Sequence, residues 1–261
     1  MTEPSTPNPE SAIFNLQSEI PFPPWGFRDL ALLTVCAVGS LLLAQAGGLA
    51  LWAAARGGPH LPDLKILMKD VRFLLPIQSV AYVMIVLAIY LLVVVRHRQK
   101  FLDAVRWRTV GGRWPAFLFL GTALAFASQL LPLLFPRNRR MPIEELFTGP
   151  LAGYLLAFFG IAIAPFVEEL FFRGLVYPVF EKHWGLEAAV LATGACFAAI
   201  HVPQLGGGWP EVVAIFLVGS AFSYARGRTG SLVPPYLMHV GYNTTLFAAI
   251  FVASQGFKKF N

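Results

Sequence analysis

The chain has 261 residues, of which 56% are hydrophobic and only 13% are charged, and its mean hydropathy is +0.63. This composition is too apolar for a water-soluble domain of such length, and it favours a protein whose solvent is the lipid bilayer. The net charge of +6 does not indicate nucleic-acid binding, because the largest basic cluster, between residues 96 and 113, directly follows an apolar run and suits an anionic lipid surface.

The first segment, residues 1–27, is acidic and rich in proline. It lacks the basic start and the short apolar core of a secretory signal peptide. We predict that it forms a disordered N-terminal tail.

Long apolar runs follow the tail, and a helix needs about 20 consecutive apolar residues to cross the hydrocarbon core of a bilayer. Four runs reach this length without a charged side chain: 30–55, 73–95, 115–136 and 146–167. None of them shows the strict alternation of a membrane β-barrel strand.

The remaining apolar runs are less regular. Residues 188–200 and 212–224 form shorter uncharged runs, whereas 229–257 is long but contains His239. The sequence therefore predicts an all-α, multi-pass transmembrane helical bundle of about seven spans, within a range of six to eight.

The two halves of this bundle differ in charge. The three spans of residues 28–140 contain no charged side chain, whereas residues 141–261 place charges within their spans. Charged groups inside a bilayer are costly and usually functional. We therefore expect a three-span N-terminal membrane region, 28–140, and a second membrane region, 141–261, that carries the function.

Three charged residues occupy the end of the fourth apolar segment: Glu168, Glu169 and Arg173. Glu169 and Arg173 are four residues apart and share a helix face, while Glu168 points about 100° away from Glu169. We predict a Glu169–Arg173 pair that leaves Glu168 free to act as a general base. Pro165 should disturb the helix and free a carbonyl nearby. A buried ion pair that only fixes helix packing is the alternative.

Two histidines and an asparagine complete the set of polar residues. Glu168 and His201 lie nearly the same number of residues from a turn expected near Gly185, so two antiparallel helices place both about 25 Å from it. Asn243 follows His239 by one helical turn on the same face. A single buried histidine is more often a packing residue, but the whole group predicts one polar site.

These residues fall into three short motifs. Residues 168–173 read EExxxR, residues 197–201 read FxxxH, and residues 239–243 read HxxxN. At these motifs the chain resembles the CPBP family of CAAX prenyl proteases and bacteriocin-processing proteins, also called the ABI family. The resemblance covers roughly residues 146–251 and implies an intramembrane endopeptidase.

The resemblance also implies roles for the motif residues. Glu168 and His201 would activate a water molecule, while His239 and Asn243 would stabilise the oxyanion of the tetrahedral intermediate. The Glu169–Arg173 pair would support them.

The resemblance leaves the cofactor open, since members of this family are commonly labelled metalloproteases. No cofactor is certain, and zinc remains an alternative with Glu168, His201 and His239 as candidate ligands. The sequence has no HExxH pair, and Asn243 is an unusual zinc ligand but a natural oxyanion donor. These two features favour a metal-free site.

The expected partners are the lipid bilayer and a peptide or protein substrate at the membrane, with no nucleic acid. The expected location is the cell membrane, either a plasma or an inner membrane. Whether the substrate carries a prenyl group or a leader stays open. Two other functions use the same buried residues: a proton-coupled transporter or channel, and a non-catalytic membrane scaffold.

Overall fold

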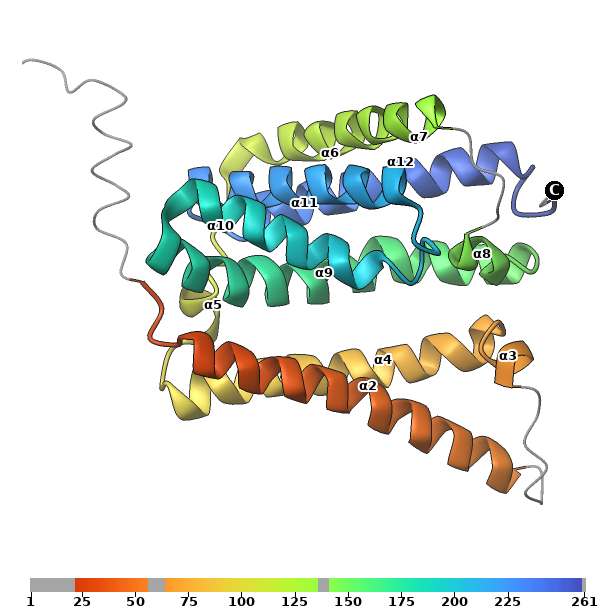
Figure 1. The fold of residues 1–261 in the computed structure, drawn as a ribbon, viewed down its shortest axis with the longest axis horizontal. Coiled ribbons are helices and arrows are strands. Elements are labelled where there is room, and N and C mark those ends of the chain that lie inside the picture. The colour runs from red at the N-terminus through yellow and green to blue at the C-terminus, as the bar shows by residue number, and fades with distance from the viewer. Residues whose placement is uncertain (1–21, 56–63, 136–140, 260–261) are drawn as a thin grey trace, which may run out of the picture.

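The computed structural model describes residues 22–55, 64–135 and 141–259, and all regular structure within these ranges is helical (Figure 1). The N-terminal part contains these helices: α2 (Phe27–Ala55), α3 (Leu64–Leu67), α4 (Val71–Tyr90), the π-helical η1 (Leu91–Arg96), α5 (Phe101–Ala104), the 3₁₀-helical η2 (Gly111–Arg113), α6 (Trp114–Ser128) and α7 (Leu130–Leu134).

The C-terminal part begins with a 3₁₀ turn and continues through a long, irregular helical run. Its elements are η3 (Pro142–Leu146), α8 (Pro150–Phe158), the π-helical η4 (Phe159–Ile163), α9 (Ala164–Glu169), the π-helical η5 (Leu170–Val176), α10 (Tyr177–His201), α11 (Trp209–Thr229) and α12 (Val233–Ala253).

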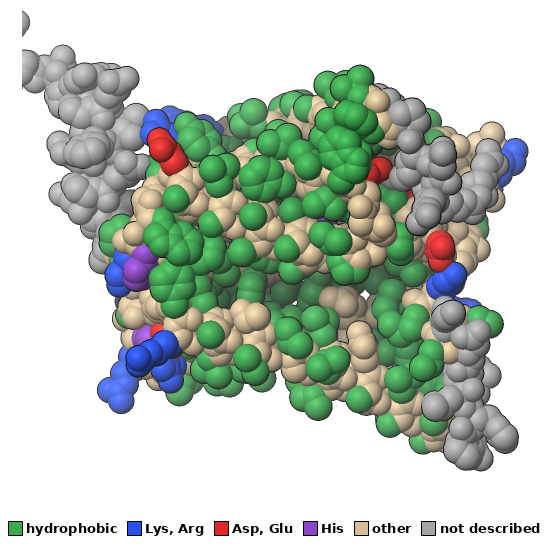
Figure 2. Space-filling view, in the orientation of Figure 1, with side chains coloured by type: hydrophobic (Ala, Val, Ile, Leu, Met, Phe, Trp, Pro, Cys, Tyr) green, Lys and Arg blue, Asp and Glu red, His purple; other side chains and the backbone are tan. Residues whose placement is uncertain are grey.

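Five helical runs in the described residues are long and apolar enough to cross a membrane: Phe27–Ala55, Val71–Arg96, Gly111–Pro132, Pro150–His201 and Val233–Ala253. Large apolar side chains lie exposed along the molecule, and charged side chains gather near its two ends in the view of Figure 2. Because apolar side chains face outward over the length of these helices, the bilayer is the solvent that matches this surface. The predicted all-α membrane bundle is confirmed.

The run Pro150–His201 contains 52 residues, which at 1.5 Å per residue would measure about 78 Å and exceed the bilayer. It does not continue straight, because Gly185 adopts φ 76° and ψ 176° and interrupts the helix. The chain reverses there, and the second half of α10 returns alongside α9 (Figure 1). The turn predicted near Gly185 is thus present. The total of seven spans stays a prediction, because α11 is not among the five apolar runs.

Contacts between distant segments define two ends of the bundle. At one end, Asp29 Oδ1 pairs with Arg96 Nε at 2.9 Å, and the rings of Phe27 and His183 lie 4.7 Å apart. We call this the basic end, because it also holds the 96–113 loop and the α11–α12 turn. At the opposite end, Lys69 Nζ pairs with Glu145 Oε2 at 2.6 Å.

The start of the described chain packs into the bundle. Trp25 is fully buried, and its indole Nε1 donates a hydrogen bond to the Leu175 carbonyl at 3.3 Å. The sequence suggested a disordered tail up to residue 27, but residues 22–27 belong to the folded structure because the Trp25 ring has a pocket and a hydrogen-bond partner. Residues 1–21 lie outside the described ranges, and the boundaries of the two membrane regions remain predictions.

Small residues allow the helices around the site to approach closely. A Cβ on Gly121 of α6 would collide with the Met238 carbonyl of α12, and one on Gly241 would collide with the Leu118 carbonyl. Such backbone contact is typical of membrane helices, where small side chains permit close van der Waals packing. It fixes the position of α12, which carries His239 and Asn243.

Candidate active site

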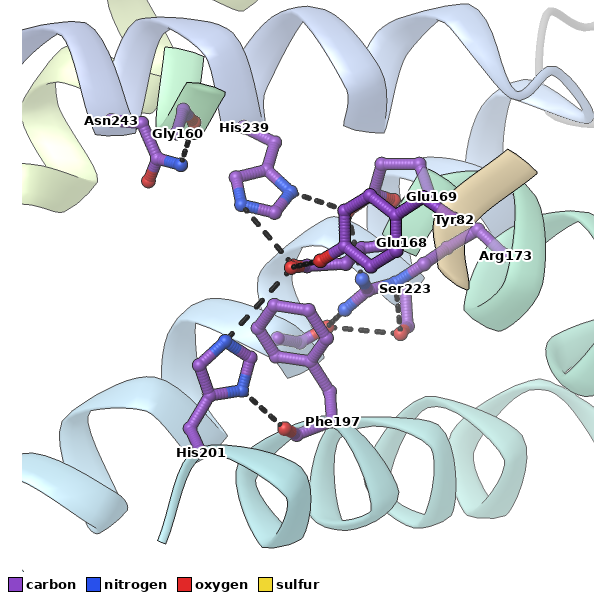
Figure 3. Close-up of polar contacts among 11 residues, drawn as sticks. Tyr82, Gly160, Glu168, Glu169, Arg173, Phe197, His201, Ser223, His239 and Asn243 are labelled. Carbon is purple, nitrogen blue, oxygen red and sulfur yellow. Dashed lines mark hydrogen bonds and ion pairs between the residues drawn. The ribbon is translucent and has the colours of Figure 1, made fainter. Parts of the chain in front are cut away.

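The polar residues predicted from the motifs meet between α9, η5, α10 and α12 (Figure 3). Glu168 is their centre: its Oε2 lies 4.0 Å from His201 Nε2 and 3.8 Å from His239 Nε2. Its side chain retains 15% exposure, whereas that of Glu169 is fully buried. The helix therefore turns one carboxylate toward two imidazoles and the other into the protein interior.

Glu169 belongs to a buried polar chain. Its Oε1 accepts hydrogen bonds from Arg173 Nη1 at 2.8 Å and from His239 Nδ1 at 2.9 Å. Arg173 also donates from Nη2 to the Gly219 carbonyl at 2.7 Å and from Nε to Ser223 Oγ at 3.2 Å. The predicted Glu169–Arg173 pair is present, and this chain joins α9 to α11 and α12.

Aromatic rings enclose this ion pair. The Arg173 guanidinium lies 4.5 Å from the centre of the Phe197 ring and 5.5 Å from that of Phe222. The same two rings contact the histidines, since Phe197 packs against His201 at 4.6 Å and Phe222 against His239 at 5.1 Å. Cation–π contacts offset part of the cost of burying the charge, and the rings restrict both imidazoles.

The hydrogen bonds of the two histidines determine which ring nitrogens face Glu168. His201 Nδ1 lies 2.7 Å from the Phe197 carbonyl, which can only accept, so Nδ1 carries the proton. His239 Nδ1 likewise donates to the carboxylate of Glu169. In the neutral form of each ring the Nε2 lone pair points toward Glu168, where it can accept a proton or orient a water molecule.

The space around Glu168 Oε2 suits a small bridging group. Distances of 3.8 and 4.0 Å are too long for direct hydrogen bonds. For a water molecule about 2.8 Å from both Glu168 Oε2 and His201 Nε2, the angle between the two contacts at the water oxygen would be about 90°. The arrangement can therefore hold a water against a carboxylate and an imidazole together.

Asn243 lies at the edge of this group, and its Nδ2 donates to the Gly160 carbonyl at 2.6 Å. The Ala164 N–H bonds to the Phe159 carbonyl, five residues earlier, as in a π-helix. In the same register the Gly160 carbonyl would accept from the N–H of residue 165, which is proline. Proline has no N–H, and the side chain of Asn243 takes its place. The carbonyl that Pro165 was expected to free is therefore that of Gly160. The second N–H of the Asn243 amide remains available for another acceptor.

The sequence did not single out Tyr82, which comes from α4 in the N-terminal membrane region. Its hydroxyl donates to Glu168 Oε1 at 3.4 Å, and its ring stacks on Phe159 with 5.4 Å between ring centres. Tyr82 lies in an apolar run without any motif, so no local signal distinguished it. Only the packing of α4 against α8 and α9 brings it to the site.

The fit of a metal can be tested on the three candidate ligands. Two imidazoles with fixed Nδ1 protons and one carboxylate are a suitable donor set for zinc. Ligand atoms about 2.0 Å from a tetrahedral zinc are about 3.3 Å apart, closer than the 3.8 and 4.0 Å found around Glu168 Oε2. Within the described ranges, no group of three or more His, Cys, Asp or Glu side chains is spaced to hold a metal ion. The three side chains, as the structure places them, do not fit a zinc ion.

Comparison with known proteins adds a family. Residues 149–245 match the family described as type II CAAX prenyl endopeptidase Rce1-like. A stretch of 84 residues is 34% identical to an uncharacterised 24.3 kDa protein of Escherichia coli, covering 31% of this chain and 38% of that protein. The chain thus spans well under half of that relative's length. No solved structure matches the chain significantly.

The matched range contains all three motifs and ends within α12, and it excludes α2, α4 and α6. The resemblance inferred from the motifs is therefore confirmed, and the apolar helices identify an integral membrane protein. Residues 149–245 are thus similar to the type II CAAX prenyl endopeptidase Rce1-like family, as the motifs indicated.

Proposed function

We propose that the protein is an intramembrane endopeptidase of the cell membrane that hydrolyses a peptide bond in a membrane-associated protein. The observation that carries the proposal is the contrast between the two adjacent glutamates. Glu169 is fully buried and its Oε1 accepts hydrogen bonds from Arg173 and His239, whereas Glu168 is partly exposed and faces two imidazole nitrogens. A carboxylate placed in this way has no packing task that explains it.

In the proposed reaction, Glu168 and His201 hold a water molecule and Glu168 Oε2 takes its proton. The resulting hydroxide attacks the scissile carbonyl carbon and forms a tetrahedral intermediate with a negatively charged oxygen. His239, when both its ring nitrogens carry a proton, and the remaining N–H of Asn243 donate to this oxygen. The C–N bond then breaks, and Glu168 returns the proton to the leaving amine.

The family description makes a prenylated CAAX-type protein the first substrate to test. A leader-bearing precursor is the second, since it would also approach from the membrane. Zinc is the alternative way to activate water, but Glu168, His201 and His239 would have to move closer together to hold it. Metal analysis of the purified protein tests this alternative independently of activity.

The decisive variant is Glu168→Gln, which keeps the shape of the side chain and removes its charge and basicity. We expect cleavage of a quenched fluorescent farnesylated CAAX peptide to fall by about 100-fold or more, because a general base contributes about 10² to 10⁴. The melting temperature in detergent should change little. Glu187→Gln, an exposed glutamate on α10, is the matched control and should keep full activity.

Substrates should also be sought without assuming a prenyl group. Membrane proteomes of cells with the wild-type protein and the Glu168→Gln variant are compared by mass spectrometry of new peptide termini. Unchanged cleavage by the purified variant would refute the role of Glu168. Proton flux through proteoliposomes without any hydrolysis would instead identify a transporter.

A further inference from the structure

The helix that carries the site contains a second π-helical segment, η5, which begins directly after Glu169 and includes Arg173. In this segment the Tyr177 N–H bonds to the Phe172 carbonyl, five residues earlier. The next N–H in the same register would belong to residue 178 and would bond to the Arg173 carbonyl. Residue 178 is proline, so the Arg173 carbonyl loses this main-chain partner.

Arg226 of α11 provides a substitute. Its Nε donates to the Arg173 carbonyl at 3.1 Å, and its guanidinium lies 5.8 Å from the centre of the Tyr177 ring. The neighbouring Gly227 has no side chain, and a Cβ there would collide with Tyr177. The absence of a side chain at Gly227 therefore lets α11 lie close to Tyr177, where Arg226 reaches the Arg173 carbonyl.

Apart from the Tyr177 ring and the nearby charge of Glu181, the guanidinium of Arg226 has few partners. Its residue exposure is 1%, and within the described ranges its Nη1 and Nη2 have no hydrogen-bond partner. Burial of a guanidinium with so few hydrogen bonds is costly. The bond from Nε to the Arg173 carbonyl is the side-chain hydrogen bond that Arg226 makes within the described ranges.

A second carbonyl freed by a proline and bonded by a side chain lies on the other side of the catalytic glutamates. There Pro165 frees the Gly160 carbonyl at the end of η4, and Asn243 of α12 donates to it. Glu168 and Glu169 lie in the short α-helical segment between the two π-helical turns. Each proline-freed carbonyl is therefore held by a side chain from a different helix, one on either side of the active carboxylates.

We propose that Arg226 is a positioning residue that holds the register of η5 through the Pro178-freed carbonyl, and with it the Arg173–Glu169–His239 chain. A slip of η5 to α-helical register would rotate Arg173 by about 100° relative to the residues before it. Arg173 would then lose Glu169, and His239 would lose its orientation. The effect on catalysis rests on the proposed peptidase function, but the effect on the turn does not.

Two substitutions separate the hydrogen bond from the charge. Arg226→Gln places Nε2 the same number of bonds from Cα as Arg Nε, so it keeps the donor without the charge. Arg226→Met has a similar length and no donor. We expect the Met variant to lower kcat by about 10-fold to 100-fold with little change in KM, because small misplacements of catalytic groups carry costs of this order. The Gln variant should stay within about threefold of wild type.

A second pair tests the proline directly. Pro178→Ala restores a main-chain N–H that can bond to the Arg173 carbonyl. In the Arg226→Met background it should therefore recover the melting temperature and kcat, whereas in the wild-type background it should raise neither. Pro165→Ala should show no such coupling with Arg226→Met. The N–H that it adds would serve the Gly160 carbonyl, which accepts from Asn243 and not from Arg226. Exposed Arg228→Met controls for loss of charge on α11.

The ¹⁵N resonances of His239 in histidine-labelled protein provide a readout that needs no substrate. Arg226→Met should shift the Nδ1 signal bound to Glu169, and Pro178→Ala should restore it. Independent effects of Arg226→Met and Pro178→Ala on melting temperature, with an unchanged His239 signal, would overturn the proposal. If wild type cleaves no peptide but the coupling is present, the peptidase function fails and the positioning role stands.

Discussion

At the scale of single residues, the site depends on the different burial and hydrogen bonding of two adjacent glutamates. Glu169 accepts two strong hydrogen bonds in a fully buried position, whereas Glu168 lies 3.8 to 4.0 Å from two histidines and contacts one hydroxyl, that of Tyr82. Tyr82 occupies Oε1, which leaves Oε2 as the oxygen that faces both imidazoles. In the proposed mechanism, the tyrosine thereby leaves Oε2 as the oxygen of Glu168 that accepts a proton from water.

Tyr82→Phe removes this hydroxyl and keeps the stacking on Phe159. The lost hydrogen bond to a carboxylate is long, at 3.4 Å, so we expect a loss on the order of 1 kcal/mol, about fivefold in kcat. Peptide cleavage at saturating substrate measures it. Tyr90→Phe, on the same helix and without a contact to the site, should have wild-type kcat, and an equal loss in both variants would contradict the specific role of Tyr82.

At the scale of helices, the site is held by backbone approach and by irregular turns. Gly121 and Gly241 bring α6 and α12 into backbone contact, and the two π-helical turns flank the segment that carries Glu168. π-helical turns cost hydrogen-bond regularity and are common at functional sites. Here each freed carbonyl has a side-chain donor, so the irregularity links the helix that carries Glu168 to α11 and α12.

Gly241→Ala tests the close approach of α6 and α12. The new Cβ would collide with the Leu118 carbonyl, and we expect a destabilisation of about 1–3 kcal/mol because backbone cannot move aside as a side chain can. Thermal unfolding in detergent should show a lower melting temperature. Gly47→Ala in α2, where a Cβ meets nothing within 4 Å, should leave the melting temperature unchanged or raise it. Equal effects at both positions would argue against close packing as the cause.

At the scale of the whole molecule, the bundle has a basic end and an opposite end. Leu232 N–H bonds to the Arg106 carbonyl, and Ser231 Oγ donates to the Arg108 carbonyl, so the α11–α12 turn is attached to the basic loop. At the other end Ile143 N–H bonds to the Gln204 carbonyl. Since lysine and arginine are favoured on the cytoplasmic side, the basic end is expected to face the cytoplasm.

This arrangement predicts the sidedness of exposed loops. In a Cys36→Ala, Cys196→Ala background, Gln99→Cys and Lys182→Cys should react with a membrane-impermeant thiol reagent from one side of the bilayer, because both lie at the basic end. Gln204→Cys should react only from the other side. Labelling in right-side-out and inverted vesicles measures this, and reaction of all three positions from one side would exclude the arrangement of helices across the membrane.

Much of the site could be predicted from the sequence because its information is local. Helix periodicity places Glu169 next to Arg173, and nearly equal distances from Gly185 place Glu168 and His201 at one depth, where the structure brings them within 4.0 Å. The roles of these residues in catalysis stay predictions. Apolar run length likewise determined the all-α membrane fold, since the bilayer requires long apolar helices.

Tertiary structure alone decided what depends on contacts between distant segments. Tyr82 reaches Glu168 across 86 positions of the chain, Trp25 reaches Leu175 across 150, and Arg226 holds the carbonyl freed by Pro178. No periodicity connects such positions, because helix packing in lipid is set by van der Waals fit and not by an amphipathic pattern. The sequence by itself determined the solvent, the helices and the polar motifs, and the packing decided which side chains complete the site.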